Sequence, residues 1–242
     1  MHLEKLLAHR RSVRLFSNKK AIPPDDIEEC LRLATLAPTS SNMQLWQFIH
    51  LADSKWREEL TKACLGQTAA SSATQWVVFV TRQDLFRSRA KFLLNYEKEN
   101  IKRNSPKARQ LKRIADREIY YGKIMPFLYA RFFRLLGIIR KLIVTILGVF
   151  RPIVREVSES QMRTVVHKSC ALAAQTFLLA MAEKGYDTCP MEGFDSKRVK
   201  KLLHLPRGTD INMIVSCGVR DGNKGIWGDR CRLPFEEVYE RR

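Results

Sequence analysis

Residues 158–185 read "SESQMRTVVHKSCALAAQTFLLAMAEKG" and form a long helical pattern late in the chain. Ser158 is a residue type that caps helix N-termini, and Gly185 is one that ends helices, so the stretch predicts one helix between them. Small side chains in its middle would let another helix approach closely: Ala171, Ala173 and Ala174.

Short apolar runs bounded by polar segments predict three strands. They are "LWQFIHL" (45–51), "WVVFV" (76–80) and "INMIVSCGV" (211–219). Helices are predicted at Leu3–His9, at residues 23–38 and from about Ser54 to Cys64. The second of these helices opens on two prolines, has two aspartates in its first turn and closes at a proline. The chain is therefore interpreted as one α+β domain, residues 1–242, with a helical insertion at about 84–157.

The composition excludes disorder as a description of the whole chain, because 45% of the 242 residues are hydrophobic and 9% are aromatic. The net charge of +18 suggests an anionic partner, which could be a phosphate ligand, nucleic acid or an acidic membrane surface. Residues 84–157 hold 18 Lys plus Arg and 6 Asp plus Glu, so +12 of this charge lies there and +6 elsewhere.

The cysteines predict reduced core thiols of an intracellular protein, because none forms a C-x-x-C pair and none has a His at metal-ligand spacing. No metal site is predicted. The N-terminal "MHLEKLLAHRRS" lacks the continuous apolar stretch of a secretory signal. A cytoplasmic protein is expected, with peripheral attachment to the inner face of a membrane as an option. The six cysteines are Cys30, Cys64, Cys170, Cys189, Cys217 and Cys231.

The segment 127–155 combines apolar and basic residues, and its first 24 residues contain no proline. A continuous helix of that length would be roughly 36 Å long. Its basic residues argue against a membrane span, since each costs about 2.5–3.5 kcal/mol at a bilayer centre. On a helix, one stripe is apolar, and the basic residues fall on the opposite half with Gly137 and Gly148. The stripe consists of Leu128, Phe132, Leu135, Ile139, Leu142, Ile146 and Phe150.

This pattern describes a basic amphipathic helix, or two such helices end to end. It could pack on its own domain, cover an apolar groove as a lid, contact a dimer partner or lie on an anionic membrane surface. Nucleic acid is the least favoured partner, because the aromatic residues lie on the apolar face, away from the cations that would contact phosphates.

Four short stretches carry residues suited to a phosphate and an aromatic ligand. Arginines and a serine can hold a phosphate through charge-assisted hydrogen bonds, and a glycine allows close approach of the backbone. Asp195 or Ser196 can cap the helix that follows the third stretch. The stretches are "RRSVRLF" (10–16), "APTSSNMQLWQF" (37–48), "CPMEGFDSKRVKKLL" (189–203) and "WGDRCRLPFEEV" (227–238).

In this order, the patterns R-R-S-x-R, S-x-N-x-Q-x-W, P-x-E-G-F and R-x-R-L-P resemble the FMN-dependent nitroreductase family. The resemblance covers the chain except the enlarged insertion. It implies a central mixed or antiparallel sheet surrounded by helices, and a homodimer with two FMN molecules at the subunit interface. NADH or NADPH would pass a hydride to FMN, and a nitroaromatic, quinone-like or other conjugated acceptor would then take it.

The resemblance also implies a set of FMN-binding residues, while the chemistry needs no catalytic side chain. The phosphate would be held by Arg10, Arg11, Ser12, Arg230 and Arg232, helped by Thr39, Ser40 and Asn42 of the partner subunit. The flavin ring would be bordered by Arg14 and Gln67 at its pyrimidine edge and lined by Pro190, Met191, Glu192 and Gly193, with the amides of the last two toward N5 and O4.

One position departs from the family pattern. A proline usually follows the Gln of the second motif, and this chain has Leu45 there, which changes what that turn can adopt. The competing hypothesis is a peripheral membrane-binding protein that uses the fold as a scaffold, with little or no redox turnover.

Overall fold

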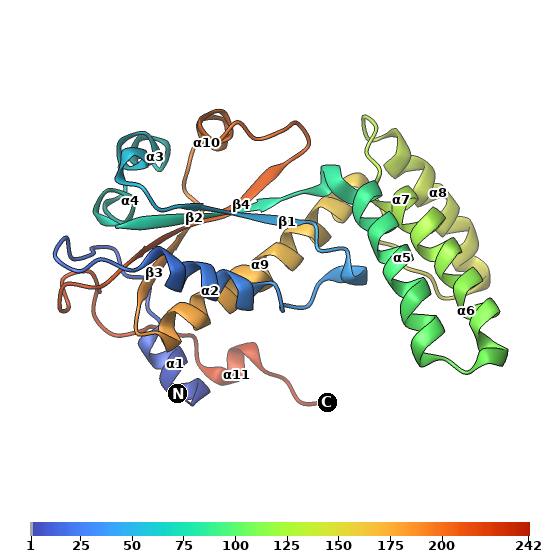
Figure 1. Ribbon diagram of the computed structural model, residues 1–242, viewed down its shortest axis with the longest axis horizontal. Helices are drawn as coiled ribbons and strands as arrows, with labels where there is room; N and C mark the ends of the chain where they lie inside the picture. Colours follow the sequence, from blue (N-terminus) through green and yellow to red (C-terminus); the bar gives the residue numbers. More distant parts are fainter. Residues whose placement is uncertain (1) are drawn as a thin grey trace.

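The computed structural model describes residues 2–242 and contains a four-stranded antiparallel sheet in the order β1-β2-β4-β3 (Figure 1). The resemblance predicted a mixed or antiparallel sheet, and the observed pairing is antiparallel throughout. Three strands were predicted within a residue or two of their ends, and β3 was missed. The strands are β1 (Trp46–Leu51), β2 (Gln75–Thr81), β3 (Asp187–Met191) and β4 (Asp210–Gly218).

Strand β2 lies inside the sheet and is buried along its whole length. Its side chains alternate between two hydrophobic cores: Trp76 and Val78 join the core on one face, and Val77 and Phe79 join the core on the other. This double burial explains why the run "WVVFV" is apolar throughout instead of alternating with polar residues.

Helices α2 (Pro24–Ala34) and α9 (Glu159–Glu183) cover one face of the sheet. The predicted ends of α9 are confirmed. Ser158 forms a reciprocal capping box with Gln161, and Gly185 ends the helix region at φ +79°. Among the described residues, α9 is also the helix long and apolar enough to cross a membrane, but 56% of its apolar window is buried in this core.

The opposite face is covered by α3 (Arg57–Ala63), α4 (Thr68–Ser72) and α10 (Ser196–Leu202). Asp195 accepts hydrogen bonds from the backbone N–H groups of Lys197 and Arg198, so the predicted cap of α10 is confirmed. The missed strand β3 has five residues, includes Pro190 and lies at the end of the sheet order, where a missing N–H is tolerated.

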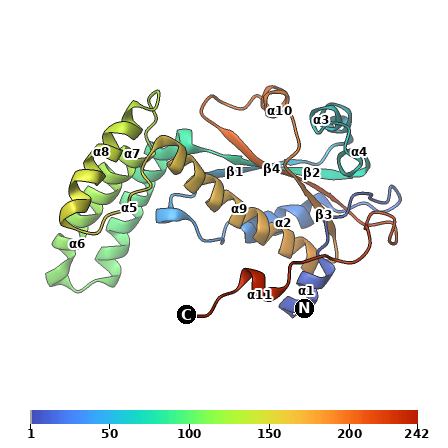
Figure 2. The ribbon, with the colours of Figure 1, turned by 180° about the vertical axis from the view of Figure 1, so that it is seen from behind.

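A group of helices extends beyond the edge of the sheet at which β1 begins and β2 ends (Figures 1 and 2). A small core joins it to the domain through Met43, Leu45 and the start of α9. The predicted segment 127–150 is two helices, because the chain turns extended at Ala130 and takes positive φ at Phe133 and Arg134 before the second helix begins. The members are α5 (Phe86–Asn104), α6 (Lys107–Ile119), the π-helical turn η4 (Tyr120–Ile124), α7 (Met125–Tyr129) and α8 (Leu135–Phe150).

The remaining elements are short, and both chain ends lie on the α1 side of the molecule (Figure 2). Five cysteines are buried as predicted, but Cys231 is exposed, which corrects the prediction of six core thiols. The short elements are α1 (Leu3–His9), η1 (Ser40–Asn42), η2 (Ser54–Trp56), η3 (Gln83–Leu85) and α11 (Phe235–Val238).

Candidate functional site

The segment after α1 runs extended beside the edge strand β3. The Val13 amide donates to the Thr188 carbonyl at 3.1 Å, and the Arg14 amide donates to the Gly225 carbonyl at 2.8 Å. Val13 is fully buried in the core, so the alternation of extended backbone turns its neighbours Ser12 and Arg14 outward. The sequence "RRSVRLF" thus uses one apolar residue as an anchor and presents polar residues on either side of it.

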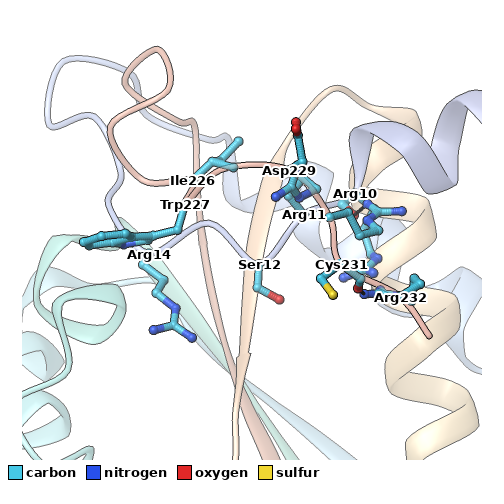
Figure 3. A pocket seen from close by; sticks show the side chains of 10 residues that line it. Arg10, Arg11, Ser12, Arg14, Ile226, Trp227, Asp229, Cys231 and Arg232 are labelled. Carbon is cyan, nitrogen blue, oxygen red and sulfur yellow. Dashed lines mark hydrogen bonds between the residues drawn. The ribbon is translucent and has the colours of Figure 1, made fainter.

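The C-terminal segment returns to the same place. Arg230 donates to the carbonyl of Arg10 at 2.5 Å, and Arg11 donates to the carbonyl of Gly228 at 2.9 Å. The result is a hollow of about 520 Å³ in which residues from both ends of the sequence meet (Figure 3). We call it the arginine hollow, and its lining is Arg10, Arg11, Ser12, Arg14, Ile226, Trp227, Asp229, Arg230, Cys231 and Arg232.

Arg10 is the arginine of the hollow whose charge is most affected by burial and by its neighbours. Burial lowers the pKa of its guanidinium, and the neighbouring Arg230, Arg232 and Arg11 lower it further through charge repulsion. Its Nε is buried and has no hydrogen-bond partner among residues 2–242. Clustered guanidinium donors with an unused buried N–H, beside the Ser12 hydroxyl, fit a phosphate group, which offers several acceptors and two negative charges.

An ion pair between Asp187, the first residue of β3, and Arg220, just after β4, stabilises the backbone next to the arginine hollow. The Asp187 carboxylate, whose side chain is 2% exposed, accepts hydrogen bonds from the Nε and the backbone N–H of Arg220, each at 2.7 Å. Arg220 also donates to the His9 carbonyl at 2.9 Å, next to Arg10. The pair therefore fixes the start of the site segment against β3 and β4.

A second pocket of about 620 Å³ continues from the hollow and shares Ser12, Arg14 and Trp227 with it. Its walls combine small and apolar groups with the polar side chains of Arg14, Gln67 and Lys224, which suits a flat ring that carries polar atoms at its edge. We call it the ring pocket, and its remaining lining is Leu15, Gly66, Gln67, Thr68, Ala69, Cys189, Pro190 and Lys224.

Gln67 stands at the border of the ring pocket, where its Nε2 donates to the Gly193 carbonyl at 2.6 Å. This bond brings together two predicted residues that are far apart in the sequence. Glu192 and Gly193 are exposed and line neither pocket, whereas the Met191 side chain is 3% exposed and belongs to the core. Met191 can therefore contact a ligand only through its backbone.

The predicted residues Thr39, Ser40 and Asn42 do not line either pocket. They lie in and beside η1, which contacts the η4 turn of the α5–α8 group through Ser41 and Tyr120. The Ser40 amide donates to the Ser169 Oγ of α9 at 3.2 Å. The structure thus separates them from the arginine hollow within one chain.

The loop that carries these residues has an unusual backbone. Ser41, Asn42 and Gln44 all have positive φ, between 48° and 53°. Tyr120 and Tyr121 fasten it, with the Tyr120 hydroxyl 2.8 Å from the Ser41 Oγ and the Tyr121 hydroxyl donating to the Ser41 carbonyl at 3.0 Å. Backbone held in such sparsely populated conformations is typical of functional loops.

The departure at Leu45 has a structural reason. Gln44 takes φ +48°, whereas a proline at 45 would restrict the residue before it to extended conformations. Leu45 instead packs in the small core beneath the α5–α8 helices and is 3% exposed. The substitution fits this turn to the enlarged insertion.

Several residues that line the two pockets were not predicted from the sequence, among them Lys224, Trp227 and Asp229. Trp227 borders both pockets and is 84% exposed, and Asp229 follows it in the same loop before Arg230 (Figure 3). Lys224 precedes Trp227 in the chain and lines the ring pocket. The signal for Trp227 was its place at the start of the fourth motif, since an exposed tryptophan beside arginines is typical of a ligand site. Residues 2–242 hold no group of three His, Cys, Asp or Glu side chains suited to a metal.

Residues 7–219 match the model of the nitroreductase family. MhqN of Bacillus subtilis, which carries the name of an NAD(P)H nitroreductase, is 24% identical over 220 residues, covering 88% of this chain and 86% of MhqN.

Two crystal structures show the same fold. The ydfN protein of Bacillus subtilis has a TM-score of 0.71 at 21% identity, over 99% of this chain and 98% of ydfN. A protein of Exiguobacterium sibiricum, named as a nitroreductase and solved in complex with FMN, has a TM-score of 0.68 at 17% identity, over 100% of this chain and 98% of its own.

Proposed function

This chain belongs to the nitroreductase family, and we propose that it is an NAD(P)H-dependent FMN oxidoreductase acting on a nitroaromatic, quinone-like or other conjugated acceptor. The observation that carries the proposal is the junction of two pockets, an arginine hollow suited to a phosphate and a ring pocket suited to a flat heterocycle. FMN combines these two chemical groups in one molecule.

The residues present fit FMN. Arg10, Ser12 and Arg232 offer phosphate donors in the arginine hollow, with Arg11 and Arg230 beside them. Arg14 and Gln67 border the ring pocket, and Gln67 is hydrogen-bonded to the carbonyl of Gly193, the residue that with Glu192 is assigned to the flavin ring. When bound, FMN supplies hydride transfer between the nicotinamide and the acceptor.

The protein's own part is to bind, orient and shield. Arg14 places a positive charge where the two pockets meet, which favours negative charge on a ligand held there. Trp227 offers an apolar surface over the same place, and Pro190 offers one in the wall of the ring pocket. A ring held against these surfaces would lose its contact with water there, which strengthens the electrostatic effect of Arg14.

The proposal includes a homodimer in the cytoplasm, in which the loop with Thr39, Ser40 and Asn42 completes the arginine hollow of the partner subunit. Two observations support it: the loop lies away from the hollow of its own chain, and its positive-φ backbone is fastened by Tyr120 and Tyr121. We also propose that the chain is one nitroreductase domain, in which the helices of residues 84–157 are an insertion.

The first test is flavin content and turnover. The purified protein is expected to be yellow or to take up FMN, and its flavin absorbance is expected to bleach with NADH or NADPH without oxygen. Re-oxidation by a series of nitroaromatic, quinone and enone acceptors then identifies the acceptor class. A protein that stays colourless after incubation with FMN would contradict the proposal and favour a membrane-binding scaffold without turnover.

The second test is complementation between subunits. A chain with Arg10→Ala and Arg232→Ala is refolded together with a chain carrying Asn42→Ala, each inactive or weakly active alone. In a shared-site homodimer, random assembly makes about half of the dimers mixed, and every mixed dimer has one intact site of two, so about a quarter of wild-type activity should return. No recovery in verified mixed dimers would show that the loop serves its own chain.

A further inference from the structure

Helix α8 has an outward face made almost entirely of apolar side chains. Of its nine exposed residues, eight are aliphatic or aromatic and the ninth is Thr145. The most exposed are Val149 at 78% and Phe150 at 82%. Soluble proteins scatter such residues singly, and a contiguous row marks a contact surface. We call this row the α8 face: Leu135, Ile138, Ile139, Leu142, Ile143, Ile146, Val149 and Phe150.

The rotation of α8 that exposes this row is fixed by an inward arginine. Arg140 is 1% exposed and donates to the carbonyls of Leu136 at 3.0 Å, Ala130 at 2.8 Å and Leu128. Gly137 lies beside it against the start of α9, where a Cβ would come within 2.9 Å of the Glu159 nitrogen. Both residues hold the polar side of α8 inward, so the α8 face cannot turn into the core.

The loop before α8 extends the same surface. Phe133 and Arg134 take φ of 45° and 67°, conformations that bulky side chains rarely adopt. The Phe133 side chain is 92% exposed, and Phe132 beside it is 55% exposed. Strained backbone that holds two phenylalanines in water is typical of a functional contact and has no value for folding.

The surroundings of the α8 face are cationic. Residues 119–155 contain seven Lys or Arg and no Asp or Glu. Beside α8 lies a groove of about 730 Å³ lined by Arg131, Arg134, Lys141 and Arg163, together with serines and the carboxylate of Glu159. Glu159 accepts the Phe132 amide at 3.0 Å, and within residues 2–242 no carboxylate pairs with Arg131 or Arg134.

The positive end of the α8 dipole lies at the same groove. No side chain caps the N-terminus of this 16-residue helix, so its first N–H groups add to the field of Arg131 and Arg134. Together they form a site suited to a phosphate of a lipid headgroup, placed directly beside an apolar face suited to acyl chains.

We propose that the α8 face and Phe133 rest in the interface of an anionic membrane, with α8 lying along the surface and the groove holding lipid phosphates. An amphipathic helix with basic flanks binds in this way, its apolar side sunk about 5–10 Å into the headgroup boundary. A second copy of this chain docked through the same face is a poorer occupant, because residues 119–155 of that copy offer no Asp or Glu to pair with Arg131 and Arg134. The proposal does not rest on the redox chemistry.

The test is flotation of the full-length, FMN-incubated protein with lipid vesicles. The protein is expected to float with vesicles of phosphatidylcholine and phosphatidylglycerol at roughly three to one, much less with phosphatidylcholine alone, and less as salt rises. Arg131→Gln with Arg134→Gln should weaken binding roughly ten- to thirtyfold. Phe133→Ser with Leu142→Gln should weaken it at least about tenfold.

Matched controls come from α6, which is also basic. Arg109→Gln with Lys112→Gln removes the same charge, and Leu111→Gln removes a leucine that is 84% exposed. Both controls should retain binding, and all variants should keep the wild-type circular dichroism and FMN content. Equal losses from α6 and α8 variants, or no flotation at low salt, would overturn the proposal. Dissociation of a dimer by Leu142→Gln without lipid would assign the face to a second copy.

Discussion

Arg10 and Arg140 are both partly withdrawn from water, and burial lowers the pKa of both guanidinium groups. Each of the three side-chain nitrogens of Arg140 donates to a backbone carbonyl. Arg10 has a buried Nε without a partner and lies among three other arginines. The comparison separates two uses of one residue type: an arginine whose three nitrogens all donate to the backbone stabilises the fold, and one with a buried unbonded nitrogen and like-charged neighbours prepares a ligand site.

The largest expected effect is on stability. Arg140→Ala would leave the carbonyls of Leu128 and Ala130 without a partner and open a space beneath α8, so the free energy of unfolding should fall by roughly 3 kcal/mol or more. FMN affinity should stay unchanged in the folded fraction. Urea denaturation of the apoprotein measures the first quantity and flavin titration the second. A loss below about 1 kcal/mol would show that Arg140 is not a structural residue.

At Arg10 the opposite result is expected: weaker FMN binding with little change in stability. Arg10→Ala should raise the Kd for FMN roughly ten- to a hundredfold, because charge-assisted hydrogen bonds to the phosphate are lost. The unfolding free energy of the apoprotein should be unchanged or slightly higher, since repulsion from Arg230 and Arg232 is relieved. Arg32→Ala, on the exposed side of α2, is the control. If Arg10→Ala lowers the unfolding free energy and leaves the Kd for FMN unchanged, Arg10 is a structural residue like Arg140 and the contrast between them is wrong.

The smallest effect is a change in the rate of one thiol reaction. Burial raises the pKa of the Cys30 and Cys64 thiols to about 11, so both stay protonated and unreactive up to that pH. Cys231 is exposed between Arg230 and Arg232. At about pH 8, iodoacetamide should modify Cys231 first, and FMN should slow that reaction by covering the hollow. Mass spectrometry follows each site, and equal rates with and without FMN would place the ligand elsewhere.

The sequence predicted much of the fold and the arginine hollow. The ends of α1, the capping box of α9 and the apolar run of β2 depend on neighbours in the chain, so local patterns were sufficient. Strand β3 was missed because Pro190 and its short length weaken the strand pattern, and its place is set by pairing with β4. Trp227 was missed as a lining residue, since only the return of the C-terminal segment brings it to Ser12.

The amino-acid sequence by itself determined that the region of α8 has an apolar side and a basic side, because helical periodicity sorts side chains into faces whatever surrounds them. It could not determine which side turns inward. That choice depends on partners distant along the chain: the carbonyls at the end of α7 that accept from Arg140, and the start of α9 that fits against Gly137. The same reason applies to Arg10, whose four-arginine environment exists only after both ends of the chain meet.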